Sequence, residues 1–270
     1  MSNTKRYLAA LTIAGSDSGG CAGIQADLKT FSALYVFGTS VITSITAQNT
    51  QGVRAVEALS PEIIRQQSEA VLDDITIDAV KTGMLPSPEI IEVVAGVIDR
   101  YKLKNIIVDP VMVATSGARL ASASTAGSFK KELYRRITLI TPNIPEAEAL
   151  SGVSIQAEKD FQKAAEVLLA QGCPAVLIKG GHLSSAYSVD ILFRQDQQPV
   201  LFSSPRVATA NLHGTGCAFS SAIAACCALG QELEAAIKLA KTYISSAIQS
   251  GSKMALGKGH GPVNYFFDRR

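Results

Sequence analysis

The segment His213–Cys217 reads HGTGC and precedes an apolar run of small residues. If a helix begins near Gly216, the backbone N–H groups from Gly214 to Cys217 would face an anion. Helix N-termini have this property because they carry unpaired donors and a partial positive charge. The G-x-G here lacks the third glycine and the early βαβ context of a dinucleotide fingerprint. The sequence therefore predicts an anion site composed of Gly214, Thr215, Gly216 and Cys217.

The thiol of Cys217 admits three interpretations: a packed small residue, a nucleophile or a base. Most buried cysteines are inert, whereas a thiol at a helix N-terminus is expected to have a lowered pKa and raised reactivity. Spacing alone leaves the choice open. His182 and His213 are candidate ligand contacts, and the three histidines lack the spacing of a metal site.

A second glycine-rich loop, Ala14–Gly23, reads AGSDSGGCAG. Gly15 and Gly20 have the P-loop spacing, but Cys21 and the next residue replace its lysine and hydroxyl, so the Walker interpretation fails. A loop closing over a small ligand and a tight strand-to-helix turn both remain possible. Asp27, in the expected helix 23–34, would face that ligand or complement the positive helix end.

Two further motifs suit a phosphorylated ligand. In TPNIPEAE, Asn143 and Glu146 can act as a polar pair near a magnesium-bound phosphate, or as the N-cap and N3 residues of a capping box. The two interpretations are compatible. In IKGGH, Lys179 ends a strand and can contact a phosphate as a point charge, or remain a solvated edge lysine.

Short apolar runs alternate with amphipathic segments along the chain, which predicts a parallel sheet covered by helices on both faces. The expected strands are Leu8–Ala14, Val41–Thr46, Asp78–Lys81, Asn105–Val108, Thr138–Ile140 and Ala175–Ile178, followed by a hairpin of Ser188–Arg194 and Pro199–Ser203. The expected helices include Pro61–Asp74, Ser87–Tyr101, Lys159–Gln171, Gly216–Leu229 and Glu232–Ser250. Residues 1–270 are expected to form a single domain, with ligands bound at the carboxyl ends of the strands.

The bulk composition excludes several classes of protein. The formal net charge is +2, which argues against nucleic acid or an anionic membrane as the main partner. Five cysteines without a C-x-x-C favour a reducing cytoplasm over a disulfide framework. The uncharged stretches contain too many polar residues to span a membrane. We expect a cytoplasmic protein without a membrane anchor.

Taken together, the ordered motifs resemble the hydroxymethylpyrimidine/phosphomethylpyrimidine kinases of thiamine biosynthesis, in the ribokinase-like superfamily. They span nearly the whole chain: LTIAGSDSGGCAGIQADLKTF, ITAQNTQGV, VKTGMLP, VDPVM, LITPNIPEAE, IKGGH, HGTGCAFSSAIA and GKGHGPVNYF. The resemblance implies a ribokinase-like α/β fold. It also implies ATP-dependent phosphorylation of 4-amino-5-hydroxymethyl-2-methylpyrimidine to its monophosphate and then to its diphosphate.

Site residues follow from the resemblance, motif by motif. Gln48 would pair with the aminopyrimidine edge, and Cys217 would occupy the position of the catalytic base beside the anion hole. Lys179 would contact phosphate, and Asn143 with Glu146 would serve the magnesium of MgATP, Glu146 through water. The other residues implied to line the pyrimidine pocket are Gly15, Asp27, Met84 and Val111. Cys21 departs from the glycine or alanine expected in the first loop, which puts the closure of that loop in question.

The nearest alternative is a pyridoxal kinase of the same architecture, for which an apolar residue is expected in place of Gln48. A cysteine hydrolase using Cys217 and His213 lacks a third orienting group, and a non-catalytic ATP-binding module is a further alternative. A homodimer is expected from the resemblance, and dependence on a monovalent cation is possible. The chain would use a partner or a flap to close its pocket.

Overall fold

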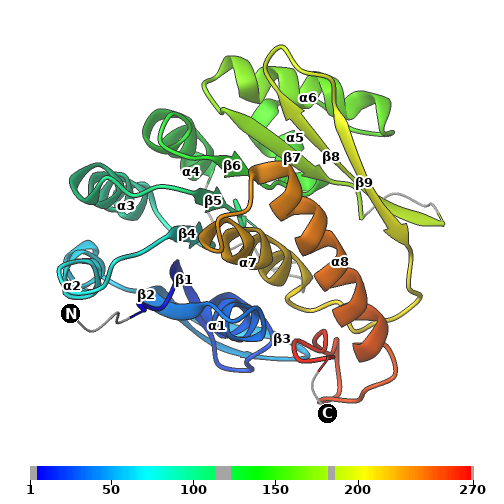
Figure 1. The fold of residues 1–270 in the computed structure, drawn as a ribbon, viewed down its shortest axis with the longest axis horizontal. Coiled ribbons are helices and arrows are strands. Elements are labelled where there is room, and N and C mark those ends of the chain that lie inside the picture. The colour runs from blue at the N-terminus through cyan, green and yellow to red at the C-terminus, as the bar shows by residue number, and fades with distance from the viewer. Residues whose placement is uncertain (1–4, 113–122, 182–185, 269–270) are drawn as a thin grey trace.

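The computed structural model describes residues 5–112, 123–181 and 186–268, and within them one continuous sheet organises the chain (Figure 1). The sheet has nine strands in the order β3-β2-β1-β4-β5-β6-β7-β8-β9. The strands are β1 (Ala9–Asp17), β2 (Phe37–Asn49), β3 (Gly52–Ala58), β4 (Ala79–Thr82), β5 (Ile106–Val108), β6 (Leu139–Ile140), β7 (Ala175–Lys179), β8 (Tyr187–Arg194) and β9 (Val200–Pro205). All neighbours from β2 to β7 are parallel. The expected mostly parallel α/β sheet is confirmed.

Helices cover both faces of this sheet, as its apolar central strands require. The helices are α1 (Gly23–Ala33), α2 (Pro61–Leu72), α3 (Pro88–Tyr101), α4 (Ala123–Ser128), η1 (Phe129–Leu133), α5 (Ile144–Ser151), α6 (Lys159–Ala170), α7 (Thr215–Ala228) and α8 (Leu233–Gly251). One buried apolar cluster joins α2, α3, η1, α5 and α6 to one face of the sheet. A second cluster joins α1, α7 and α8 to the other face, where Figure 1 shows α7 across the middle of the sheet.

The two ends of the sheet are antiparallel, and only one of them was expected. The hairpin β8–β9 matches the prediction within two residues and pairs with β7. At the opposite end, β3 pairs antiparallel with a β2 that runs beyond the predicted Thr46 to Asn49. Because most side chains of β3 are exposed, the strand has little of the apolar alternation on which strand prediction depends. This extension carries Gln48 past the end of the neighbouring strand β1, whose pairing with β2 ends at Asp17 and Thr46.

Local capping signals explain where several helices begin. Ser60 and Ser87 each accept a hydrogen bond from a backbone N–H at the start of α2 and α3, and proline follows in the first turn of both helices. Among the helices that the structure describes, none is both long and apolar enough to cross a membrane.

Candidate active site

The residues of the predicted anion site lie at the start of α7, at the carboxyl edge of the sheet. Gly214 is the N-cap residue with φ of 81°, a left-handed conformation that favours glycine. A Cβ at Gly214 would lie 1.8 Å from the carbonyl oxygen of Cys21, so the two glycine-rich loops touch where only glycine fits. Thr215, Gly216 and Cys217 form the first turn of α7. The N–H of Thr215 donates to the carbonyl of Leu212 at 3.2 Å, whereas first-turn position leaves Gly216 and Cys217 without an acceptor inside the helix. The predicted helix start is confirmed.

The C-terminal segment, residues 261–265, holds these two loops together. The hydroxyl of Tyr265 donates a hydrogen bond to the carbonyl of Cys21 and lies 2.7 Å from the position of a Cβ on Gly214. Beside it, the backbone N–H of His213 donates to the carbonyl of Gly261 at 3.1 Å. Tyr265 is buried, with burial raising the pKa of its hydroxyl, so this hydroxyl acts as a neutral donor. The segment therefore positions both loops.

A cluster of charged residues faces the anion site from β5, β7 and α5. The Lys179 Nζ donates to Asp109 Oδ1 at 2.7 Å and lies 4.0 Å from Glu146 Oε2. The same Nζ lies 3.5 Å from the position of a Cβ on Gly216, at the start of α7. The structure thus brings together Lys179, Glu146 and the anion site, which the sequence predicted separately.

Asn143 and Glu146 form the predicted capping box of α5. The N–H of Glu146 donates to Asn143 Oδ1 at 2.9 Å, and the N–H of Asn143 donates to Glu146 Oε2 at 2.8 Å. Burial raises the pKa of Glu146 to about 7, reinforced by the charge of Asp109 and opposed by that of Lys179. A carboxyl oxygen is a suitable ligand for a hard divalent cation, directly or through water, and burial beside the carboxylate of Asp109 favours a further positive charge here. The residues present therefore fit magnesium.

The pKa of Cys217 corrects one expectation from the sequence. We expected the helix N-terminus to lower it, but burial raises the pKa of this thiol to about 11. The carboxylates of Asp27 and Asp109 add to the increase, while the ammonium of Lys81 opposes it. The thiol of the ligand-free protein is therefore protonated at neutral pH, because burial outweighs the helix end.

Asp27 forms a buried ion pair that the sequence did not predict. Its side chain is fully buried in the second turn of α1 and forms an ion pair of 2.9 Å with the equally buried Lys81. Its carboxylate accepts hydrogen bonds from Thr12 and Ser221, each at 2.6 Å. The aspartate thus ties α1 to β1, β4 and α7 from a fully buried position.

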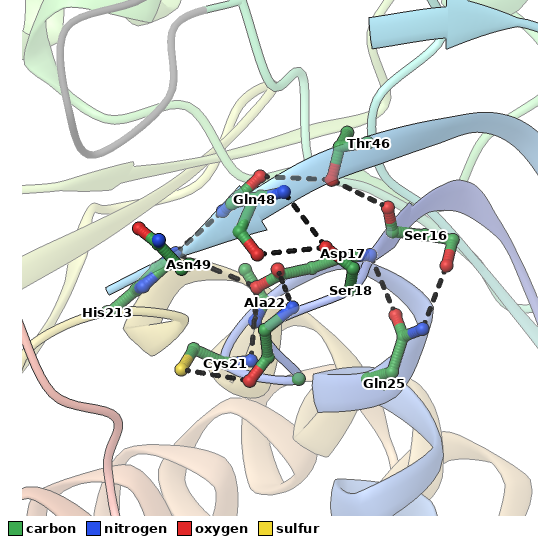
Figure 2. Close-up of polar contacts among 12 residues, drawn as sticks. Ser16, Asp17, Ser18, Cys21, Ala22, Gln25, Thr46, Gln48, Asn49 and His213 are labelled. Atoms are coloured by element: carbon green, nitrogen blue, oxygen red, sulfur yellow. Dashed lines mark hydrogen bonds and ion pairs between the residues drawn. The ribbon is translucent and has the colours of Figure 1, made fainter. Parts of the chain in front are cut away.

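Gln48 lies beyond the carboxyl end of β1, where two loops meet (Figure 2). Its Nε2 lies 3.0 Å from Nε2 of His213, and its Oε1 lies 3.3 Å from the hydroxyl of Thr46. Its backbone N–H donates to the hydroxyl of Ser18 at 2.9 Å, which in turn donates to the Gln48 carbonyl at 2.8 Å. This side chain is half-buried, and its contacts are uncharged hydrogen bonds.

Of the remaining residues expected to line the pyrimidine pocket, Gly15 and Met84 lie in contact with each other. A Cβ on Gly15 would lie 2.6 Å from the terminal methyl carbon of Met84, so the glycine leaves the room that Met84 occupies. Val111 is half-buried just after β5, and its N–H donates to the carbonyl of Asp109 at 2.8 Å. His182, a candidate ligand contact, lies outside the described residues.

The closure of the first loop is explained by Asp17. Its carboxylate accepts backbone N–H groups from Gly19, Cys21 and Ala22 at 2.8 to 3.0 Å (Figure 2). Donor atoms of Asp17, Cys21 and His213 lie within 4.8 Å of one another, a grouping that can hold a metal ion. Because the carboxylate is already occupied by this turn and the thiol donates to the carbonyl of Gly19 at 3.6 Å, the cluster is explained by loop closure.

Three residues at this site did not stand out in the sequence: Asp109, Lys81 and Tyr265. Asp109 and Lys81 lie in the quoted motifs VDPVM and VKTGM, at the ends of β5 and β4, so their position was a usable signal. Tyr265 lies in the C-terminal motif, but no local pattern connects it with Cys21, from which 244 positions separate it.

Fold and site together define a small-molecule kinase: an α/β sheet whose carboxyl edge holds a glycine-lined anion site, a lysine and buried carboxylates. The family model for phosphomethylpyrimidine kinase matches residues 17–264, and the chain belongs to this family. It is 46% identical to the hydroxymethylpyrimidine/phosphomethylpyrimidine kinase of Bacillus subtilis, covering 97% of this chain and 96% of that protein. It is 49% identical to the thiamine biosynthesis bifunctional protein ThiED of Geobacter sulfurreducens, covering 94% of this chain and 51% of that protein.

Solved structures agree with the fold. A crystal structure of the ADP complex of Bacillus subtilis pyridoxal kinase matches with a TM-score of 0.90 at 38% identity, covering 98% of this chain and 99% of that one. The ribokinase-like expectation is confirmed. The chain spans about half of the bifunctional relative and nearly all of the hydroxymethylpyrimidine/phosphomethylpyrimidine kinase from Bacillus subtilis.

Proposed function

We propose that this protein phosphorylates 4-amino-5-hydroxymethyl-2-methylpyrimidine with ATP, first to the monophosphate and then to the diphosphate, in thiamine biosynthesis. The observation that carries the proposal is the position of Lys179, paired with Asp109 and beside Gly216 at the start of α7. That placement gives a transferring phosphoryl group a cation and a set of backbone donors at the same point. The matches to kinases with this activity support the choice of substrate.

Gln48 supplies the recognition of the pyrimidine ring in this proposal. An amide offers donors and an acceptor side by side, which complements a ring nitrogen next to an exocyclic amine. Met84, Gly15 and Val111 form the apolar part of the same pocket. Asp27 and Lys81 hold the pocket wall from behind, because both are buried and paired with each other.

Phosphoryl transfer needs mainly positioning and charge neutralisation, because its transition state is loose. Lys179 and the N–H groups of Gly214, Thr215, Gly216 and Cys217 would hold the oxygens of the transferred group. Asn143 and Glu146 would hold Mg²⁺, with Glu146 acting through water. When bound, this ion supplies further positive charge to the phosphate oxygens.

Cys217 is proposed to take the proton of the substrate hydroxyl late in the first transfer. The second transfer has less need of a base, because the oxygen of a monophosphate is already anionic near neutral pH. Since the free thiol has a pKa of about 11, this role requires the thiolate to form within the assembled site.

Pyridoxal is the second candidate substrate, because a pyridoxal kinase of known structure has the same fold over nearly the whole chain. Pyridoxal also carries a hydroxymethyl group on an aromatic ring. Gln48 favours the aminopyrimidine, so pyridoxal is proposed as a side substrate.

We further propose a homodimer of single-domain subunits in the cytoplasm, with a monovalent cation as an optional activator. The continuous nine-stranded sheet supports a single domain. Sedimentation would test the dimer, and activity with and without potassium would test the cation.

The deciding experiment measures ADP release from MgATP with hydroxymethylpyrimidine, its monophosphate or pyridoxal as acceptor. We expect turnover of both pyrimidines and a lower kcat/KM for pyridoxal. Efficient turnover of pyridoxal alone would contradict the proposal and support the alternative.

A further inference from the structure

His213 lies against Gln48 although 165 positions separate them in the sequence. The histidine is buried, with 6% of its surface exposed. Its backbone is fixed by a hydrogen bond to the carbonyl of Gly261 and by a parallel bridge to Pro262. The ring is therefore held in place by the C-terminal segment, and the proposed mechanism has assigned it no role.

The contact between the two side chains links the orientation of the amide to the tautomer of the imidazole. In the observed orientation Gln48 Nε2, which carries two hydrogens, lies 3.0 Å from the imidazole Nε2, and the contact is a hydrogen bond when that ring nitrogen carries the lone pair. The amide then keeps one free N–H and, beside the 3.3 Å contact of its Oε1 with Thr46, one free lone pair. That remaining pair is the complement of a ring nitrogen and an adjacent exocyclic amine.

Thr46 does not fix which end of the amide faces it. A hydroxyl can donate or accept, and that of Thr46 already lies 2.9 Å from the carbonyl of Ser16 (Figure 2). Because its one hydrogen lies closer to that carbonyl than to Gln48 Oε1 at 3.3 Å, Thr46 holds the amide oxygen only weakly. Among the contacts that the described residues make with this amide, the one with His213 at 3.0 Å is the shorter.

We propose that His213 is the positioning residue that sets the orientation of the Gln48 amide and thereby the preference for an aminopyrimidine over pyridoxal. The inference rests on the proposed function, in which Gln48 pairs with the pyrimidine edge. If the ring carries a proton on Nε2, it needs an acceptor, and the Gln48 oxygen turns toward it. The outward donor and acceptor then exchange places, and the aminopyrimidine meets donor against donor.

The groups around His213 decide when that exchange occurs. Burial lowers the pKa of His213, the nearby His260 lowers it further, and the carboxylate of Asp17, whose Oδ2 lies 3.9 Å from the ring nitrogen, opposes both. The thiol of Cys21 belongs to the same cluster. Because the net change is downward, the ring is neutral at neutral pH and becomes protonated only in acid.

The test compares His213→Leu, which removes the acceptor, with His213→Gln, which offers a non-titrating amide oxygen. His260→Gln removes the exposed histidine that lowers the pKa of His213, so it should move the acid limb of the profile to slightly higher pH and leave the KM at neutral pH unchanged. KM and kcat for hydroxymethylpyrimidine and pyridoxal are measured from about pH 5.5 to 8, the range in which histidines titrate.

For the wild type we expect the pyrimidine KM to rise in acid while kcat changes less. His213→Leu should raise that KM about tenfold at neutral pH, the worth of one hydrogen bond, whereas His213→Gln should keep the preference and lose the pH dependence.

A double-mutant cycle with Gln48→Ala separates positioning from a general structural effect. In the Gln48→Ala background, His213→Leu should not change the pyrimidine KM further. Additive losses, or an unchanged substrate preference in His213→Leu, would overturn the inference. A wild-type protein that does not phosphorylate hydroxymethylpyrimidine would instead refute the proposed function, so the two failures are distinguishable.

Discussion

The two ends of this site are built from different chemistry. At the proposed ring end, Gln48, His213 and Thr46 meet through uncharged hydrogen bonds. At the proposed phosphate end, Lys179, Asp109 and Glu146 form a charged cluster beside the start of α7. Charge attracts any phosphate whatever its orientation, whereas neutral donors and acceptors distinguish one ring edge from another. The rate of phosphoryl transfer should therefore depend on the charged end of the site, and the preference between substrates should depend on the neutral end.

The largest expected effect comes from removing the cation at the phosphate end. Lys179→Met should lower kcat by about two to three orders of magnitude, the usual cost of losing one transition-state contact in a buried site. The preference between hydroxymethylpyrimidine and pyridoxal should change little, because Gln48 is intact. Steady-state ADP release with both substrates measures both quantities.

The exposed Lys238, on α8, supplies the control. Lys238→Met should behave like the wild type, and melting temperatures of both variants would show whether they fold. If Lys179→Met changed the preference between the two substrates by as large a factor as it lowers kcat, the two ends of the site would not have separate roles.

The next largest effect should come from removing the thiol of Cys217 at the phosphate end. Cys217→Ala should depress phosphorylation of the alcohol by about a hundredfold, the lower range for a general base, and phosphorylation of the monophosphate far less. With the thiol pKa at about 11, the first transfer in the wild type should also gain rate as pH rises above neutrality. Iodoacetamide modification of the ligand-free protein would follow the same rise.

Equal losses in the two steps would remove the base from the mechanism. They would leave Cys217 as a packed member of the anion site, one of the three interpretations that its spacing allows.

The sequence predicted those parts of the site that depend on neighbours along the chain. The capping box of Asn143 and Glu146 follows from a spacing of three residues, and the start of α7 follows from its glycines. Alternating apolar and amphipathic segments were sufficient to predict the parallel core of the sheet.

Features that depend on tertiary contact could not be predicted in this way. The carboxylate of Asp27 is matched by Lys81, 54 positions away, a pairing that no local pattern around the helix indicates. The pKa of Cys217 depends on how deeply the folded chain buries it, and here burial outweighs the helix end. Strand β3 was not predicted because most of its side chains are exposed, so its sequence lacks the alternation of apolar and polar residues that marks a half-buried strand.

The smallest effect should come from the clamp that joins the two ends. Tyr265→Phe removes the hydroxyl that holds the carbonyl of Cys21 beside Gly214 and leaves the ring packed. One neutral hydrogen bond is worth about 1 kcal/mol, so kcat/KM should fall by about fivefold for both substrates, with an unchanged ratio between them. Tyr101→Phe, which removes an exposed hydroxyl bonded to Asp73 at 2.7 Å, is the matched control and should not change kcat/KM. A fall in kcat/KM for only one of the two substrates would contradict this expectation, because loss of a contact that holds both loops should affect both substrates.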